Sequence, residues 1–156
     1  MMPMPKLVIM VLSALLLASA AELPSKKYLN LAALKTMAAA AEAEMAKRNV
    51  QVTICIVDDG GNLLFLQKAD GAGLNTVEIA QKKARYAAIY ARPSATAATQ
   101  LKEGNLSGLI MPNGFPVQGG LPVKVDGKTI GAVACSGAAS EVDEAIAQVA
   151  IDAVLK

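Results

Sequence analysis

Histidine and tryptophan are absent from this 156-residue sequence, and aromatic residues of all kinds make up only 3% of it. Without histidine, neither a Ser-His-Asp nor a Cys-His catalytic arrangement can be built, and zinc sites of the usual Cys/His kind lack their ligands. A lone lysine or carboxylate could still serve as an acid or base, but only with a pKa shifted by burial. The composition therefore favours a binding protein over an enzyme and predicts no metal site.

Cysteine is also scarce, since Cys55 and Cys135 are the only two and form no Cys-x-x-Cys pair. Both fall in runs that are predicted to be strands. An exported protein could join them in a disulfide. Bridges between neighbouring strands are geometrically awkward, however, and a free cysteine is a common small core residue. The sequence leaves both states open.

Neither sign of charge is in excess, because 15 lysine and arginine residues oppose 13 aspartate and glutamate residues, for a net charge of +2. A nearly neutral chain lacks the basic surface with which proteins bind nucleic acid or anionic lipid. We therefore expect no nucleic-acid partner.

The long apolar run of the sequence lies at its N-terminus. Residues 1–20 contain one positive charge at Lys6, an apolar run over 7–17, and then Ala18-Ser19-Ala20. The run is shorter than the ~20 residues that a membrane-spanning helix needs, and the pattern is typical of a signal peptide. We expect residues 1–20 to be removed on export to the periplasm or the exterior. The remaining chain would comprise a short lead at 21–28 and a single domain at 29–156, without a membrane span.

What the sequence does have is a segment whose local chemistry predicts a β-hairpin, GGLPVKVDGKTIGAVACSG at residues 119–137. Residues 122–125 and 129–135 are extended runs, and Asp126-Gly127 between them tolerates the positive φ of a tight turn. A second hairpin is predicted from the alternating run 50–57, the turn cluster DDGGN and the returning run 63–68.

Helices are predicted over 31–48, from 75 to about 90, from 94 to about 103, and from 140 onward, because apolar residues recur there at three- and four-residue spacing. Asn30 is the expected N-cap of the first helix, whereas Asn75 with Glu78, and Ser140 with Asp143, resemble capping boxes. Residues 104–120 predict a long ordered loop that lines a pocket or a subunit contact. The order α-β-β-α-α-β-β-α favours an α+β fold with a mostly antiparallel sheet flanked by helices.

A family resemblance extends over most of the chain. The hairpin motif of 119–137, together with VTICIVDDGGNLLFLQKADGAG, VEIAQKKARYAAIYARPS and MPNGFPVQGG in that order, resembles the GlcG/HbpS haem-binding-type family over residues 29–155. The resemblance implies a profilin-like fold, a homo-oligomer for which an octamer is one expected size, and haem as a possible cofactor. Without histidine, only Met, Tyr, Cys, Lys or Thr could meet the haem iron.

Three functions stay open at this stage. The first, which the resemblance implies, is an exported small-ligand-binding protein of the haem-binding type without established catalysis. The second is an enzyme or catabolic accessory protein acting on a small anionic or carbonyl metabolite, with Lys83 or Asp143 as the acid or base. The third is an oligomeric scaffold.

A ligand site is expected where three segments converge: Gly119-Gly120 before the hairpin, the chain turn at Arg92-Pro93, and the start of the last helix. The glycines permit close approach of backbone or ligand, and the free N–H groups of a helix start favour an anion that Arg92 or Lys83 neutralises. The candidate ligand-binding residues are Lys83, Arg92, Gly119, Gly120, Ser136 and Gly137. The basic run Lys82, Lys83 and Arg85 is either a solvated helix face or a contact for an anion or propionate.

Overall fold

The structure is a computed structural model that describes residues 22–155, so the expected signal peptide at 1–20 lies outside the described residues. Its elements follow the order α1(Leu31–Arg48), β1(Thr53–Asp58), β2(Leu63–Lys68), α2(Thr76–Ile89), α3(Ser94–Lys102), α4(Ser107–Ile110), β3(Gly120–Val125), β4(Lys128–Ser136) and α5(Ser140–Asp152). This order confirms the predicted α+β fold and adds the short α4 within the expected loop. None of the helices described is long and apolar enough to cross a membrane.

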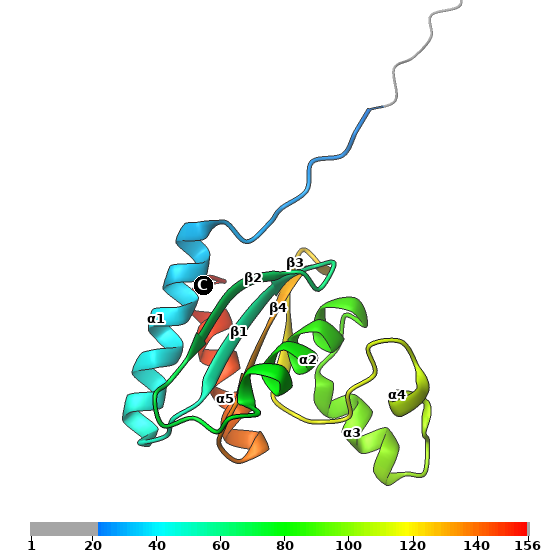
Figure 1. Ribbon diagram of the computed structural model, residues 1–156. Coiled ribbons are helices and arrows are strands. Elements are labelled where there is room, and N and C mark those ends of the chain that lie inside the picture. The colour runs from blue at the N-terminus through cyan, green and yellow to red at the C-terminus, as the bar shows by residue number, and fades with distance from the viewer. Residues whose placement is uncertain (1–21, 156) are drawn as a thin grey trace, which may run out of the picture.

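The four strands form one antiparallel sheet in the order β2-β1-β4-β3 (Figure 1). Each predicted hairpin pairs within itself, and the two hairpins join through β1 and β4, where Ile54 lies opposite Cys135. The turn between β3 and β4 is at Asp126 and Gly127, which adopt positive φ values of 51° and 74°. Glycine meets such a φ without a steric penalty and aspartate tolerates it, which is why this pair makes the turn.

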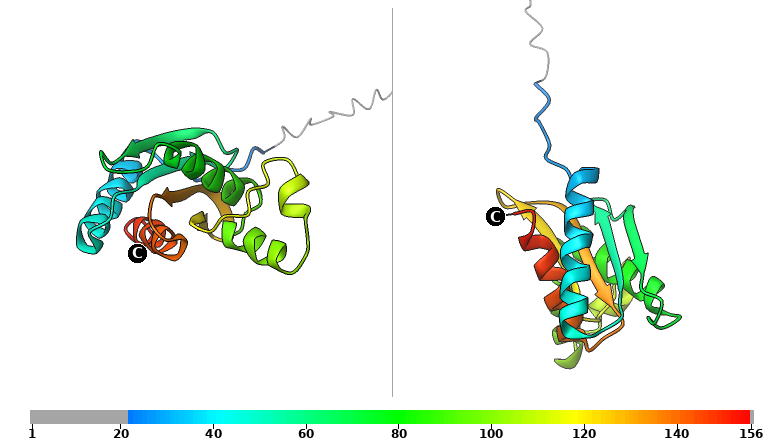
Figure 2. Two further views of the ribbon diagram at one scale, coloured as in Figure 1. Left: turned by 60° about the horizontal axis from the view of Figure 1, so that its bottom comes forward. Right: turned by 90° about the vertical axis from the view of Figure 1, so that its left-hand side faces the viewer.

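Helices cover both faces of the sheet (Figure 2). The face under α1 and α5 buries larger side chains, among them Met37, Ile54, Val133 and Ile146. The face under α2 is built mainly from small ones, among them Cys55, Ala80, Ala84, Ala87 and Ala134. Because these side chains are small, α2 packs close to the sheet, and its residues come within reach of the β3 and β4 backbone.

The two cysteines lie on opposite faces of the sheet. Cys55 pairs with Ala134 while Cys135 pairs with Ile54, so the cysteines are one register step apart on neighbouring strands. Since successive side chains of a strand point to opposite faces, the two thiols point away from each other. Both cysteines are free. Burial raises the pKa of the Cys55 thiol to about 12 and also raises that of Cys135, so both stay neutral.

Candidate functional site

The candidate site predicted from the sequence contains a buried ion pair between Lys83 of α2 and Asp143 of α5. The Lys83 Nζ donates to Asp143 Oδ2 at 2.9 Å and to the Cys135 carbonyl at 2.9 Å. Asp143 Oδ1 accepts a hydrogen bond from the Ala138 N–H at 3.0 Å. The two charged side chains are only 2% and 3% exposed. The pair therefore links the helix on one face of the sheet to the helix on the other, around the end of β4.

Burial of a charge at this depth is unfavourable unless the charge is paired and hydrogen-bonded. Here both carboxylate oxygens accept hydrogen bonds and the ammonium has two acceptors. The two residues expected to act as acid or base in an enzyme are thus turned toward each other and away from solvent. A substrate could reach them only if the chain around Gly119 moved.

Gly119 and Gly120 lie directly against Lys83. Gly119 has a φ of 124°, and a Cβ there would lie 2.7 Å from Lys83 Nζ and 3.0 Å from Asp143 Cβ. At Gly120 a Cβ would lie 2.5 Å from the Lys83 carbonyl oxygen. Such distances are well inside van der Waals contact, so neither position has room for a side chain. The glycines do permit a close approach, and the group that approaches is Lys83.

The chain directly after Arg92 contacts the Gly119-Gly120 segment through Ser94. The buried Ser94 Oγ accepts a hydrogen bond from the Gly120 N–H at 2.9 Å. The Arg92 guanidinium lies over two aromatic rings, 5.6 Å from the centre of Tyr86 and 5.5 Å from that of Tyr90. Its Nε donates to the Tyr86 hydroxyl at 2.9 Å. Ser94, two residues after Arg92, therefore contacts Gly120, whereas cation–π and hydrogen-bonding contacts with Tyr86 and Tyr90 engage the Arg92 side chain.

Ser136 and Gly137 lie where β4 ends. Ser136 is buried opposite Thr53. Gly137 is exposed, with a φ of 145°, and a Cβ there would lie 2.6 Å from the Gln51 carbonyl oxygen. These two residues border the chain that leads into β1, and the Lys83 ammonium donates to the adjoining Cys135 carbonyl and to Asp143.

Both predicted capping boxes are wrong. Asn75 at the N-cap position of α2 makes no side-chain capping hydrogen bond, and α5 has Ala139 rather than Ser140 at its N-cap position. The Asp143 carboxylate, which the box would have used, instead accepts from Ala138 and Lys83. Asp143 therefore combines a local contact to the backbone before α5 with a long-range ion pair to Lys83.

An open hollow lies on the outer side of α2. The exposed side chains of Lys82 and Arg85 line two cavities of about 210 Å³ each, one reaching Gly61 in the β1–β2 turn and the other reaching Phe115. The Arg85 Nε donates to the Gly61 carbonyl at 3.1 Å. The Lys82 ammonium lies 5.6 Å from the centre of the Phe115 ring and 2.7 Å from the Glu78 carboxylate. This hollow offers two cations and one carboxylate, Glu78, beside an aromatic face.

Comparison with known proteins places the chain in a family. The family model of haem-degrading HbpS-like proteins matches residues 29–152. The chain belongs to the HbpS-like family. Protein GlcG of Escherichia coli strain K12 is 38% identical over 98 residues, 63% of this chain and 73% of GlcG. These matches confirm the family predicted from the hairpin motif.

Two solved structures share the fold of this HbpS-like chain. A double mutant of Streptomyces reticuli HbpS is 26% identical and covers 99% of this chain and 100% of its own, with a TM-score of 0.80. PduOC in complex with haem is 27% identical and covers 83% of this chain and 96% of its own, with a TM-score of 0.76.

The basic run of the HbpS-like chain divides between two environments. Lys83 falls within the apolar stripe of Ala80, Ala84 and Ala87 and faces the sheet, while Lys82 and Arg85 lie outside the stripe and face solvent. This helical spacing was a signal in the sequence that Lys83 is buried. No local pattern indicated that Phe115, from a distant loop, lies over Lys82. The residues described contain no group of three or more His, Cys, Asp or Glu able to hold a metal ion.

Proposed function

We propose that this protein binds haem, or a similarly planar ligand with carboxylate groups, as a binding protein rather than as an enzyme. The observation that carries the proposal is the hollow on α2, where Lys82, Arg85 and Phe115 come together. Cations recognise carboxylates through charge-assisted hydrogen bonds, and an aromatic face suits a flat apolar body. Membership of the HbpS-like family and the similarity to the haem-bound PduOC support haem as that ligand.

The hollow fits haem at its propionates and at its edge. Lys82 and Arg85 would hold the propionates, and Phe115 would lie against the ring; when bound, haem would supply a redox-active iron. Small-molecule sites commonly enclose about 300–1,000 Å³. Each cavity here encloses about 210 Å³, so part of the ring would stay on the surface.

Several sulfur atoms that could ligate haem iron are too deeply buried to contact such a ligand. The sequence contains no histidine. Four sulfur-bearing side chains are buried within the two cores: Met37, Met45, Cys55 and Cys135. The hollow therefore recognises the carboxylates and the face of the ligand, and these four residues do not ligate its iron.

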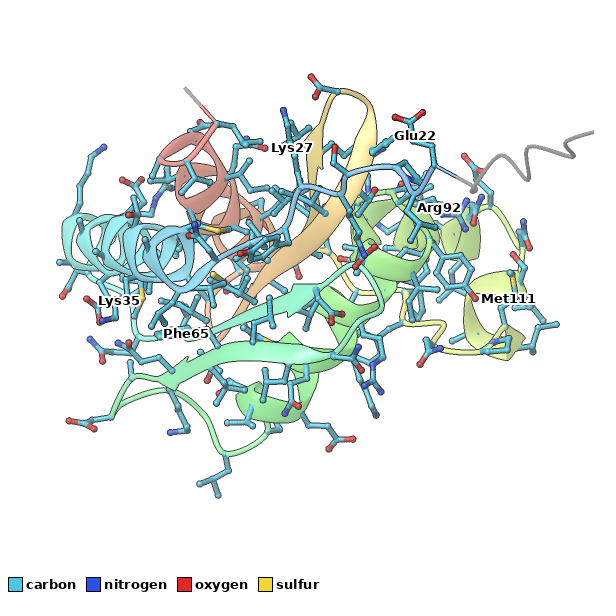
Figure 3. The ribbon with its side chains drawn as sticks, turned by 90° about the horizontal axis from the view of Figure 1, so that it is seen from above. Glu22, Lys27, Lys35, Phe65, Arg92 and Met111 are labelled. Atoms are coloured by element: carbon cyan, nitrogen blue, oxygen red, sulfur yellow. The ribbon has the colours of Figure 1, made fainter. Side chains whose placement is uncertain are left out.

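Haem titration of the purified protein tests the proposal. Wild type should shift the Soret band at micromolar haem, and the double variant K82A/R85A should bind roughly tenfold or more weakly, because two charge-assisted contacts are lost. Lys35→Ala is the matched control, since Lys35 is an exposed lysine on α1 (Figure 3). A wild-type protein that leaves the Soret band unchanged would refute haem binding. Thermal shift with small carboxylates would then test the wider ligand class.

We further propose that the chain is exported and assembles as a homo-oligomer. The pattern of residues 1–20 supports export, and mass spectrometry of the protein recovered from the periplasm or medium would show whether they are removed. Support for assembly comes from four exposed apolar side chains around α4: Leu106, Leu109, Ile110 and Met111. Contiguous exposed apolar residues are typical of interaction surfaces.

A further inference from the structure

A cavity lies beneath the N-terminal lead, at the end of the sheet where both hairpin turns lie. It encloses about 500 Å³ between residues 24–27 and the β3–β4 hairpin, including Val125, Thr129 and Ile130. A neighbouring cavity of about 360 Å³ shares Val125 and Ile130 and runs on toward the start of α1. Both volumes fall within the range of small-molecule sites, about 300–1,000 Å³.

Two consecutive lysines hold the lead over this cavity by reaching two different turns. The Lys26 Nζ lies 2.6 Å from a carboxylate oxygen of Asp59, in the β1–β2 turn. The Lys27 Nζ lies 2.9 Å from Asp126, in the β3–β4 turn. The lead leaves α1 at this end of the sheet in Figure 1, and Figure 3 shows Lys27 beside the β3–β4 hairpin. Exposed ion pairs of this kind are individually weak, so the lead can open and close.

The interior of the cavity has apolar walls. Val125 and Ile130 supply these walls, beside Ser25 and Thr129. The Thr129 Oγ1 atom is buried, so it lies behind the cavity wall and out of reach of solvent. The walls therefore offer a ligand mainly apolar contacts.

The rim of the cavity has a slight excess of positive charge. Five charged residues line it: Lys26, Lys27, Lys128, Asp59 and Asp126. Three positive and two negative groups give a net charge of 3 − 2 = +1. An occupant with an apolar body and one negative charge would match both the walls and the rim.

We infer that the space between residues 24–27 and the β3–β4 hairpin is a binding site for a small amphiphile with an anionic head, and that the N-terminal lead closes over it. The anionic head lies among the lysines of the rim, and the apolar body lies against Val125 and Ile130. This site shares no lining residue with the hollow on α2. Each site can therefore be tested without the other.

A matched pair of fluorescent dyes tests this site in the full chain. 8-Anilinonaphthalene-1-sulfonate carries a sulfonate, and N-phenyl-1-naphthylamine has the same rings without it. Wild type should bind the sulfonate dye more tightly than the neutral one. The variant K26A/K27A should weaken binding of the sulfonate dye roughly tenfold.

Two controls make the outcome decisive. Lys35→Ala removes an exposed lysine elsewhere and should leave dye affinity unchanged. K82A/R85A removes any binding of the dye in the hollow on α2, and adding K26A/K27A to that variant should still weaken binding of the sulfonate dye. Equal affinity of wild type and K26A/K27A for the sulfonate dye would overturn the inference, as would equal affinity for the two dyes. Loss of binding in K82A/R85A alone would place the dye in the α2 hollow, which would overturn the second site and leave the proposed function standing. Circular dichroism of each variant establishes that it has folded.

Discussion

Among single residues, Asp143 is one whose loss should strongly destabilise the fold. Asp143→Ala leaves the buried Lys83 ammonium without its carboxylate. Breaking a buried pair from one side costs about 3–5 kcal/mol, and we expect the free energy of unfolding in urea to fall by that amount. The double variant K83M/D143L, which removes both charges, should unfold at a higher urea concentration than Asp143→Ala.

The exposed pair of Lys82 and Glu78 is the natural control for that experiment, because its ion pair is 2.7 Å long but lies in solvent. Lys82→Ala should change the free energy of unfolding by less than about 1 kcal/mol. An Asp143→Ala protein as stable as Lys82→Ala would show that the buried pair does not hold the two helices together.

Gly119 and Gly127 differ in what surrounds them, although both have positive φ. A Cβ at Gly127 would meet nothing within 4 Å, so Gly127→Ala should cost only the backbone strain, about 1–2 kcal/mol. A Cβ at Gly119 would also meet Lys83 Nζ at 2.7 Å, and overpacking adds about 1–3 kcal/mol. Gly119→Ala should therefore have a lower melting temperature than Gly127→Ala. The reverse order would contradict the close packing of Lys83 against Gly119.

The Cys55 thiol should make stability depend on alkaline pH. Its pKa is raised from 9.0 to about 12 in the folded protein. Between these values the unfolded chain releases a proton that the folded chain keeps, so the free energy of unfolding falls as pH rises above 9. The slope for one thiol is about 1.4 kcal/mol per pH unit. Below pH 8 the thiol is protonated in both states and contributes no slope.

Urea unfolding of wild type and Cys55→Ala between pH 7.5 and 10.5 measures this slope. The alanine variant loses packing at every pH, and only the difference between the two slopes reports the thiol. Parallel curves for the two proteins would contradict a buried, neutral Cys55.

At the scale of elements, the same substitution at the N-cap positions of two helices should lower the stability of the protein by different amounts. The Asn30 Oδ1 accepts from the Ala33 N–H at 2.9 Å and caps α1. Asn30→Ala should lower the free energy of unfolding by about 1 kcal/mol, a typical value for loss of an N-cap. Asn75→Ala, at the equivalent position of α2 where no side-chain cap is made, should have a smaller effect. Equal losses in urea unfolding would contradict this assignment of the caps.

The elements themselves could be predicted because their signals are local. Asp126-Gly127 favours a tight turn whatever the rest of the chain does in space. Asn30 directly precedes the first residue of an apolar stripe with helical spacing. The contacts of the site could not be predicted in this way. Lys83 and Asp143 are 60 residues apart, and only the close packing of α2 brings them together. The predicted cap at Ser140 failed because α5 begins one residue earlier, with Ala139 at its N-cap position.

At the scale of the whole molecule, the exposed side chains around α4 predict how copies associate. The double variant L109E/I110E should reduce the mass measured by light scattering, because two carboxylates at an apolar contact must be desolvated. Leu74→Glu is the control, since Leu74 is 97% exposed and lies in the loop before α2. A wild-type protein that is monomeric at micromolar concentration, or a mass unchanged in L109E/I110E, would contradict an interface at α4.

The strand order has a further consequence for the chain as it is synthesised. The central strand β1 lies between β2 and β4, and β4 is the last strand to leave the ribosome. Until residues 128–136 emerge, the first hairpin presents an apolar strand with an open edge, which is the kind of surface that recruits other chains. A pause in translation before residues 128–136 have emerged would leave this edge open, whereas a pause after they have emerged would not. The second hairpin thus protects the nascent protein from aggregation by covering the edge of the first.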